Sequence, residues 1–340
     1  MDFGQTSAYQ IFRPVNLTIT FPRPCRGCIL QIERQALDIN DTFHSCADIN
    51  VEQFLQNTDQ IQCSGNGRLT QSGCICSKYF IGDRCQYRTD CEDNSDCLNG
   101  QCVTDSRPGL IQKFCYCDFS FFGKNCEIQS NIQNLNDECF NYKNLVDRNS
   151  AMFKAYGIFN PDCFDQRKDL NHEDFVYSRL IGNNEIEIIL DFNTTGWLAI
   201  GWRPLNLDLS CRLFPNAGAS LVQSALEAPL HPMDCTDILV ASVVEGRSRI
   251  QDMYTRDRST PLQDSFLQGR ISFSAAFGIE RDGRTVVMFR RNIQSFEQTD
   301  HPLGNGRIHG IWAKSRDGSD ELRWHGAKNR GPTVFEFVRT

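Results

Sequence analysis

Ile238-Leu239-Val240-Ala241-Ser242-Val243-Val244-Glu245-Gly246 is the stretch of sequence that decides the fold. Its first seven residues are almost all apolar and have the length of a buried β-strand. Glu245-Gly246 follows as a turn, and Arg249 to Tyr254 reads as the returning strand. We therefore predict an antiparallel hairpin whose first strand lies in a protein core.

Comparable strand and turn patterns continue on both sides of this hairpin. We expect further strands at Glu185–Ile188, Trp197–Trp202, Phe273–Phe277, Val286–Phe289, Ile308–Trp312 and Glu321–Trp324. About nine to eleven strands over roughly 165 residues are typical of an antiparallel β-sandwich, which we place at residues 171–338. The chain is thus predicted to be mainly β, with its largest domain at the C-terminal end.

The order of features in this domain resembles a DOMON domain, an immunoglobulin-like sandwich. The features that carry the resemblance are Gly196–Trp202, Met233–Ile238, Asp252-Met253-Tyr254 with Pro261 and Asp264, Phe289-Arg290-Arg291 with Asp300, and His325 with Arg330-Gly331. Haem-binding members of that family hold the iron with a Met ahead of the Asp-containing strand and a His after a late strand. The matching residues here are Met233 and His325.

The resemblance implies that Met233 and His325 are the axial iron ligands of haem b. A thioether and an imidazole would fill both axial positions and raise the reduction potential, which suits electron transfer better than oxygen chemistry. Apolar walls are expected from Trp202, Phe214, Leu230, Trp312 and Trp324. The haem propionates are expected to meet Arg323, Lys328 or Arg330.

Other interpretations of these residues remain open. A single Met is often a flexible filler of core gaps, and a lone His is often structural. His231, His301 and His309 are alternative ligands. The rival function is a non-redox extracellular module that binds carbohydrate or protein. We predict no catalytic residues, and we interpret Asp237, Asp252 and Asp264 as turn and strand-end residues.

The 17 cysteines are concentrated ahead of the sandwich, with thirteen before residue 130. Residues 87–128 have six cysteines with the spacing of an EGF-like module, together with Gly100 and Phe122-Gly123. The resemblance implies the pairs Cys91–Cys102, Cys97–Cys115 and Cys117–Cys126. Such modules are too small for a hydrophobic core and fold around disulfides. We interpret this one as a semi-rigid spacer, with a receptor or matrix contact as the alternative.

Residues 61–86 resemble a second, partial EGF-like module. It lacks two cysteines that pair with each other in the family, which leaves Cys63–Cys74 and Cys76–Cys85. Residues 129–170 are expected to be a linker clipped to the next domain by Cys139–Cys163. Cys211 and Cys235 could bridge and fix the loop that presents Met233.

Residues 1–60 are predicted to be a partial β domain with two or three strands, among them Val15–Thr20 and Ile29–Ile32. Cys25 to Gln31 and Phe43 to Ile49 resemble the closing strands of animal chitin- or cellulose-active copper monooxygenases. Their copper histidines have no counterpart here, so no monooxygenase activity is expected. Cys25, Cys28, His44 and Cys46 could bind zinc, but disulfides are the favoured interpretation.

Composition points to an oxidising, extracellular compartment. Closely spaced cysteines persist as disulfides there, and Asn16, Asn40 and Asn193 begin glycosylation sequons. A net charge of −7 argues against nucleic acid as a partner. No apolar run reaches the length of a membrane span, and the first ten residues lack a signal region, so we expect a secreted chain whose natural start is missing. The expected partner is an extracellular redox protein, a carbohydrate or another protein.

Overall fold

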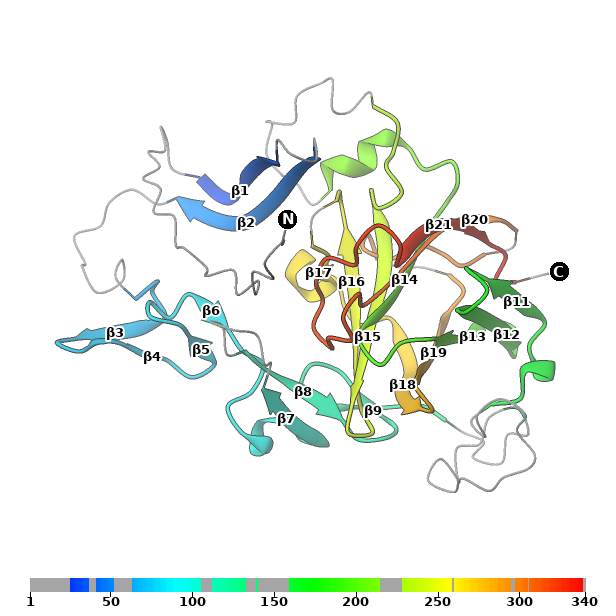
Figure 1. Ribbon diagram of the computed structural model, residues 1–340, viewed down its shortest axis with the longest axis horizontal. Coiled ribbons are helices and arrows are strands. Elements are labelled where there is room, and N and C mark those ends of the chain that lie inside the picture. The colour runs from blue at the N-terminus through cyan, green and yellow to red at the C-terminus, as the bar shows by residue number, and fades with distance from the viewer. Residues whose placement is uncertain are drawn as a thin grey trace, which may run out of the picture. The chain divides into compact units, whose positions relative to one another are not determined.

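The structure is a computed structural model that describes residues 25–36, 41–51, 63–104, 112–132, 139, 159–214, 228–258, 260–294, 297–304 and 306–338. The chain divides into two compact units, residues 1–56 and 57–340. In the first unit, β1 (Cys25–Ala36) pairs with β2 (Asp41–Val51) as an antiparallel hairpin (Figure 1). The expected strand at Ile29–Ile32 lies within β1. The expected strand at Val15–Thr20 lies outside the described residues.

The second unit begins with a four-cysteine module, residues 63–88. It contains two short hairpins, β3 (Gly67–Thr70) with β4 (Gly73–Cys76) and β5 (Phe80–Ile81) with β6 (Tyr87–Arg88). The Cys76–Cys85 disulfide joins the two hairpins, and Cys63–Cys74 joins the segment before β3 to β4. Both join the cysteines that the sequence predicts.

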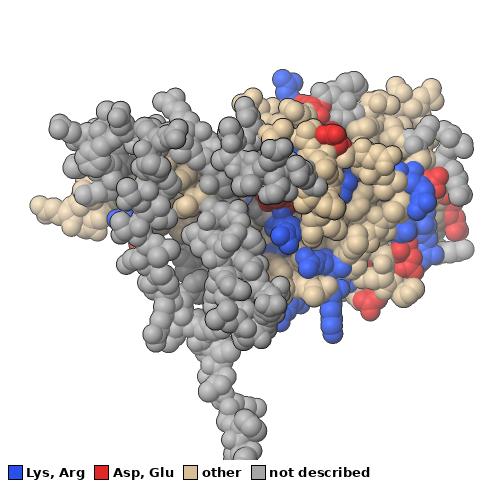
Figure 2. Space-filling model, turned by 90° about the horizontal axis from the view of Figure 1, so that it is seen from above, with Lys and Arg blue, Asp and Glu red and all other residues tan. Residues whose placement is uncertain are grey.

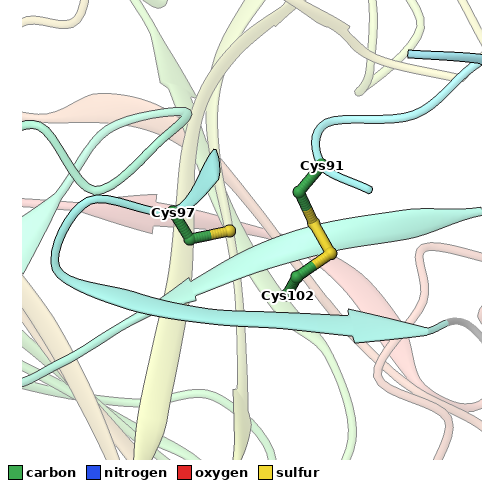
Figure 3. Close-up of side chains that lie close together, drawn as sticks. All are labelled: Cys91, Cys97 and Cys102. Carbon is green, nitrogen blue, oxygen red and sulfur yellow. A yellow bond between two sulfur atoms is a disulfide. The ribbon is translucent and has the colours of Figure 1, made fainter. Parts of the chain in front are cut away.

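The six-cysteine module, residues 91–130, follows directly. It contains the 3-10 turn η1 (Asn94–Asp96) and the strands β7 (Gly100–Thr104), β8 (Lys113–Cys117), β9 (Phe121–Phe122) and β10 (Ile128–Gln129). Its disulfides are Cys91–Cys102, Cys97–Cys115 and Cys117–Cys126, the pairs expected from the sequence. Figure 3 shows the Cys91–Cys102 bond with Cys97 beside it.

One sheet of the sandwich has five strands in the order β11-β12-β13-β19-β18. These strands are antiparallel and consist of β11 (Gln166–Asp169), β12 (Phe175–Ile181), β13 (Glu185–Phe192), β19 (Arg284–Asn292) and β18 (Phe273–Arg281). The turn η2 (Pro161–Cys163) precedes them, and Cys163 is joined to Cys139. The edge strand β11 lies within residues 129–170, the segment expected to be a linker.

The other sheet has eight strands and includes strands from the six-cysteine module. Its order is β21-β20-β14-β15-β16-β8-β7, with β17 also paired to β16. The strands that belong to the sandwich are β14 (Leu198–Arg203), β15 (Thr236–Val244), β16 (Arg247–Thr255), β17 (Leu262–Gln263), β20 (Ile308–Lys314) and β21 (Arg330–Phe335). The predicted hairpin is therefore β15 and β16. Its turn residues Glu245 and Gly246 both have positive φ, as a type I′ turn requires.

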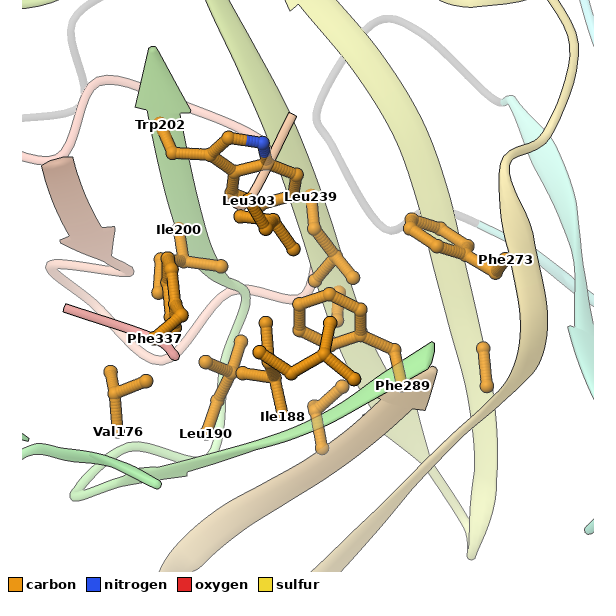
Figure 4. Packing of buried hydrophobic residues seen from close by; sticks show 14 of the residues in the cluster. Val176, Ile188, Leu190, Ile200, Trp202, Leu239, Phe273, Phe289, Leu303 and Phe337 are labelled. Carbon is orange, nitrogen blue, oxygen red and sulfur yellow. The ribbon is translucent and has the colours of Figure 1, made fainter. Parts of the chain in front are cut away.

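The main core lies between the two sheets. Alternate residues of the facing strands fill it, including Ile188 and Phe289 from one sheet and Ile200, Trp202 and Leu239 from the other (Figure 4). A second cluster, with Tyr177, Phe277 and Met288, covers the opposite face of the five-stranded sheet. The antiparallel β-sandwich expected from the sequence is confirmed.

One predicted strand is wrong. Residues 321–324 form part of the connection between β20 and β21, not a strand. Leu322 packs against the outer face of the eight-stranded sheet, whereas Trp324 is 59% exposed. The alternation of apolar and polar residues at 321–324 therefore comes from a loop that packs some of its side chains on a sheet, not from a strand. The strand at the end of the chain is β21 instead.

Lys and Arg side chains in Figure 2 are spread over several places on the described surface, with Asp and Glu among them. Within the described ranges, no helix is long and apolar enough to cross a membrane. Asn193, one of the three predicted glycosylation sites, is exposed; Asn16 and Asn40 lie outside the described residues.

Candidate functional site

Met233 lies in the short connection that leads into β15. Its backbone N–H donates to Nδ1 of His231 at 3.2 Å, and Nε2 of His309 donates to the Pro232 carbonyl at 3.0 Å. The Cys211–Cys235 disulfide closes the same segment, as the sequence suggests. Two hydrogen bonds and one disulfide therefore fix the connection. The Met233 side chain itself is half-buried.

His325 lies in the connection between β20 and β21. Its ring is half-buried, with its centroid 6.5 Å from that of Trp197. Nδ1 donates to the Gly326 carbonyl at 2.9 Å, so the lone pair of the neutral ring is on Nε2. Burial lowers the pKa of His325, which favours this neutral form.

Strand register places these two connections at opposite ends of β14. At one end, Trp202 pairs with Asp237, close to Met233. At the other end, the Trp197 carbonyl accepts from the backbone of Ser315, and His325 lies beside the Trp197 ring. Trp197 and Arg203 are six positions apart along the strand, a span of about 20 Å. The structure does not bring Met233 and His325 together.

The expected haem walls do not line one cavity. Trp202 and Trp312 are buried in the core between the sheets, and Trp324 is exposed. The outer sheet face between Met233 and His325 is packed by buried Trp197, Ile238, Val240 and Met253, with Leu322 against them. Ligation of a haem by Met233 and His325 therefore stays a prediction.

The other histidines that could serve as ligands hold backbone instead. Nε2 of His301 donates to the Cys235 carbonyl at 2.8 Å, and burial lowers the pKa of His301 to about 4. Since His309 bonds the Pro232 carbonyl, both His301 and His309 are hydrogen-bonded to the backbone on either side of Met233. They give it a fixed shape without needing a metal.

A group of buried charged residues lies between the sheets, and it corrects one interpretation of the sequence. Asp252 lies in the interior of β16 rather than at a turn or strand end, whereas Asp237 is the second residue of β15, as expected, and both are buried. Asp264 opens the turn η5 (Asp264–Leu267) and is also buried. Arg291 of β19, only 1% exposed, reaches the same space. Sequence reasoning gave no role to Arg291 or Asp300, although both stand in the quoted DOMON pattern.

The electrostatics of this buried group follow from desolvation. Burial raises the pKa of Asp237 to about 7 and that of Asp300 to about 6. Burial and the neighbouring carboxylates also raise the pKa of Asp252 and Asp264. A buried carboxylate is costly unless a proton, a cation or hydrogen-bond donors neutralise it.

The six-cysteine module is attached firmly to the sandwich. The hydroxyls of Tyr116 and Ser242 share a buried hydrogen bond of 2.9 Å. The Arg249 guanidinium lies 3.8 Å from the Phe114 ring centroid. Cys117 pairs with Ser248 across β8 and β16.

Contacts from the end of the module add to this attachment. The Phe119 ring lies 4.8 Å from that of Phe277, and the Ser130 hydroxyl accepts from the Ala276 backbone at 3.2 Å. Arg247 and Asp118 form an ion pair of 2.7 Å. A loosely connected spacer would not make these contacts, so the module and the sandwich act as one structural unit.

Two surface hollows lie in this unit. One, of about 510 Å³, is lined by Ser210, Cys211, Leu213, Phe214, Phe266, Leu267, Gln268 and Gln298. The other, of about 420 Å³, lies where the module meets the sandwich and is lined by Val103, Thr104, Tyr116, Val244, Asp317, Gly318, Ser319, Asp320, Glu321 and Arg323. The second hollow exists only because the module is docked.

Cysteine clusters do not supply a metal site in the described modules. The sulfurs of Cys91, Cys97 and Cys102 lie close together, but each is in a disulfide and so is not a thiolate ligand (Figure 3). The possible zinc ligands Cys25, Cys28, His44 and Cys46 have side chains outside the described residues.

No family model matches the chain. It is 28% identical over 127 residues to Protein eyes shut of Drosophila melanogaster, which is 34% of this chain and 5% of that protein. It is 30% identical over 92 residues to Prion-like-(Q/N-rich) domain-bearing protein 25 of Caenorhabditis elegans, which is 27% of this chain and 13% of that protein. The chain therefore spans a small part of the length of these curated relatives.

Two solved structures are similar. The cytochrome domain of Myriococcum thermophilum cellobiose dehydrogenase has 11% identity and a TM-score of 0.33, covering 51% of this chain and 81% of that one. The cytochrome b domain of pyranose dehydrogenase from Coprinopsis cinerea has 12% identity and a TM-score of 0.32, covering 50% and 80%. Similarity at this level does not bear on the ligand of this chain.

Proposed function

We propose that this chain is an extracellular binding module, in which an EGF-like six-cysteine module and a DOMON-like sandwich present one joint surface to a carbohydrate or protein partner. The observation that carries the proposal is the docking of the module through Tyr116, Arg249 and the β8–β16 pairing. A fixed spacing between surfaces on two modules favours recognition of an extended partner, because little freedom is lost on binding.

The extracellular assignment rests on the disulfides. Seven disulfides among the described residues would be reduced in a cytosolic environment and persist outside the cell. Exposure of Asn193 is compatible with a glycan at that sequon. Mass spectrometry of the secreted chain before and after glycan removal tests this assignment.

A glycan array and an extracellular protein-binding screen with the intact chain test the binding function. Arg249→Ala should weaken binding to any partner found, because it removes the cation–π contact with Phe114 and the 3.5 Å ion pair with Asp90. Arg307→Ala, which removes an exposed charge away from these contacts, is the matched control. Equal binding by Arg249→Ala and the control would show that the joint surface is not what the partner recognises.

Electron transfer through haem b is the second candidate. It is favoured by the Nδ1 hydrogen bond of His325 to Gly326, since histidine ligands commonly donate their other nitrogen to a carbonyl. Bound haem would supply one-electron redox chemistry for an extracellular redox partner. The hairpin of β1 and β2, with its resemblance to copper monooxygenase strands, would suit such pairing.

An absorption spectrum of the purified chain with added haem decides between the two candidates. Low-spin bands that disappear in both Met233→Ala and His325→Ala would establish haem ligation and replace the first proposal. If stoichiometric haem gives no low-spin spectrum, the electron-transfer candidate is excluded.

A further inference from the structure

Four aspartates and one arginine share the interior of the sandwich. Asp237 and Asp252 point inward from β15 and β16, Asp264 opens η5, and Asp300 lies in the connection between β19 and β20. Arg291 provides the cation, with Nη1 at 2.9 Å from Oδ2 of Asp237 and Nη2 at 3.6 Å from Asp300. If all five groups are ionised, one positive charge faces four negative ones.

In the carboxylates of Asp237 and Asp252, only one of the two oxygens accepts hydrogen bonds. Oδ2 of Asp252 accepts from the backbone and the hydroxyl of Ser272, both at 2.7 Å. Oδ2 of Asp237 accepts from the His301 backbone at 3.0 Å and from Arg291. Oδ1 of each carboxylate is buried without a hydrogen-bond partner. Buried acceptors are rarely left in this state.

Asp264 provides a second, independent sign that a ligand is needed. Its side chain is 1% exposed, and neither carboxylate oxygen has a hydrogen-bond partner. The Thr299 hydroxyl is close enough to lower the pKa of Asp264, but it makes no hydrogen bond of normal geometry to either oxygen. Among charged groups, Asp252 and Asp237 have the largest effect on the pKa of Asp264, so this carboxylate faces the same negative region.

The oxygen atoms are placed as the coordination shell of a metal ion requires. One oxygen each from Asp237, Asp252 and Asp300 lie within 4.8 Å of one another. Calcium binds oxygen at about 2.3–2.6 Å and magnesium at about 2.0–2.1 Å, so oxygens gathered this closely can be ligands of one such ion. Hard carboxylate oxygens without sulfur or nitrogen donors also suit these cations.

We propose that Asp237, Asp252 and Asp300 bind a divalent, oxygen-preferring cation such as calcium inside the sandwich, with Asp264 as a further ligand or as the acceptor for a bound water. The ion would join β15, β16 and the connection that carries Asp300. Because His301 bonds both Asp237 and Cys235, the ion would also stabilise the segment around Met233.

Protonation is the competing way to neutralise these carboxylates, and it predicts the opposite response. A cation competes with protons, so calcium binding should strengthen as the pH rises from 5 to 8. Protons alone would leave the chain indifferent to calcium at every pH. The groups that face the carboxylates are Arg291, His301, Tyr254, Ser272 and Thr299, with Glu297 near Asp300.

Thermal unfolding of the intact chain, first treated with chelator and then titrated with calcium, tests the site. We expect the melting temperature to rise with calcium. Asp252→Asn, which removes one ligand charge at constant size, should abolish the rise. Asp282→Asn, in the exposed turn between β18 and β19, is the control that keeps it.

Terbium luminescence adds a readout that does not depend on stability. Trp202 lies 5.1 Å from the Arg291 guanidinium, close enough to sensitise a lanthanide at the proposed site. Luminescence that calcium displaces, and that is lost in Asp252→Asn but not in Asp282→Asn, supports the site. An unchanged melting temperature at millimolar calcium together with no terbium signal overturns it. So does a calcium response that Asp252→Asn retains, because the ion would then bind elsewhere.

Discussion

In the six-cysteine module the buried apolar residues are mainly the cysteines themselves, with Phe121 packed against them. In the sandwich the core consists of large aliphatic and aromatic side chains from both sheets, and one disulfide, Cys211–Cys235, lies at its edge. The module is too small to bury enough apolar surface, so cross-links that restrict its unfolded chain take over. The module should therefore unfold when its disulfides are removed, and the sandwich when its apolar core is disrupted.

The largest effect is expected from the sandwich core. Phe289→Ala should lower the free energy of unfolding by about 3–5 kcal/mol, because Phe289 is fully buried against Trp202 and Phe273. Equilibrium denaturation measures the loss. Phe266→Ala removes the same side chain at a 61% exposed position and should cost little. Equal losses in the two variants would mean that the core does not lie between the sheets.

A comparable loss confined to the module is expected from removing a disulfide. Cys97→Ser combined with Cys115→Ser opens an 18-residue loop and should cost about 2–5 kcal/mol, seen as protease cleavage within residues 91–130. The sandwich should keep its own transition. Cys63→Ser with Cys74→Ser, in the neighbouring module, is the control. If the sandwich unfolds as well, it depends on the module for its stability.

Acid should act on the two regions in opposite directions. The folded pKa of Asp237 is raised to about 7 from an unfolded value of about 3.9, so in the absence of calcium the folded sandwich holds the extra proton between these values. Its stability should fall as the pH rises from about 4 to about 7, by at most about 1.4 kcal/mol per pH unit for each such group.

In the six-cysteine module, the hydrogen bond from the Lys78 ammonium instead lowers the pKa of Asp96. The stability that ionised Asp96 adds to this module is therefore lost at low pH. Denaturation of the chelated chain across this range, followed separately for each region, measures both slopes. Asp237→Asn should flatten the slope of the sandwich. A sandwich that grows more stable toward pH 7 would contradict the burial of these carboxylates.

The smallest effect is expected at the interface. Tyr116→Phe removes the hydroxyl that bonds Ser242 and should cost about 1 kcal/mol. Tyr87→Phe, at an exposed position, is the control. Hydrogen exchange should accelerate in both β8 and β16, since they share this contact. Faster exchange in β8 alone would show that the sandwich is insensitive to docking.

The sequence predicts the local features of both regions well. The resemblance to EGF-like modules implies five cysteine pairs, and Cys139–Cys163 and Cys211–Cys235 are suggested from their positions; all seven are disulfides among the described residues. The apolar run at Ile238–Val244 and the turn at Glu245-Gly246 likewise fix the central hairpin. These features depend on neighbours in sequence, which is why spacing and periodicity reveal them.

Features that depend on distant neighbours are not predictable in this way. In β15 every residue but the last is buried, so alternation cannot show that Asp237 points between the sheets. The predicted strand at 321–324 is wrong because four residues packed on a sheet face have the pattern of a strand. Nor does the sequence show that Met233 and His325 lie at opposite ends of β14, because this follows from the register of three strands.

The single strand pair between Ser248 and Cys117 has a mechanical consequence. Tension applied to the chain ahead of the module is carried first by this pair and by the side-chain contacts of the docked module, among them those of Tyr116 and Phe119. The sandwich ladders behind them each contain five or more pairs and share the load. The module should therefore detach under stretching before the sandwich opens, and its disulfides limit how much chain is released.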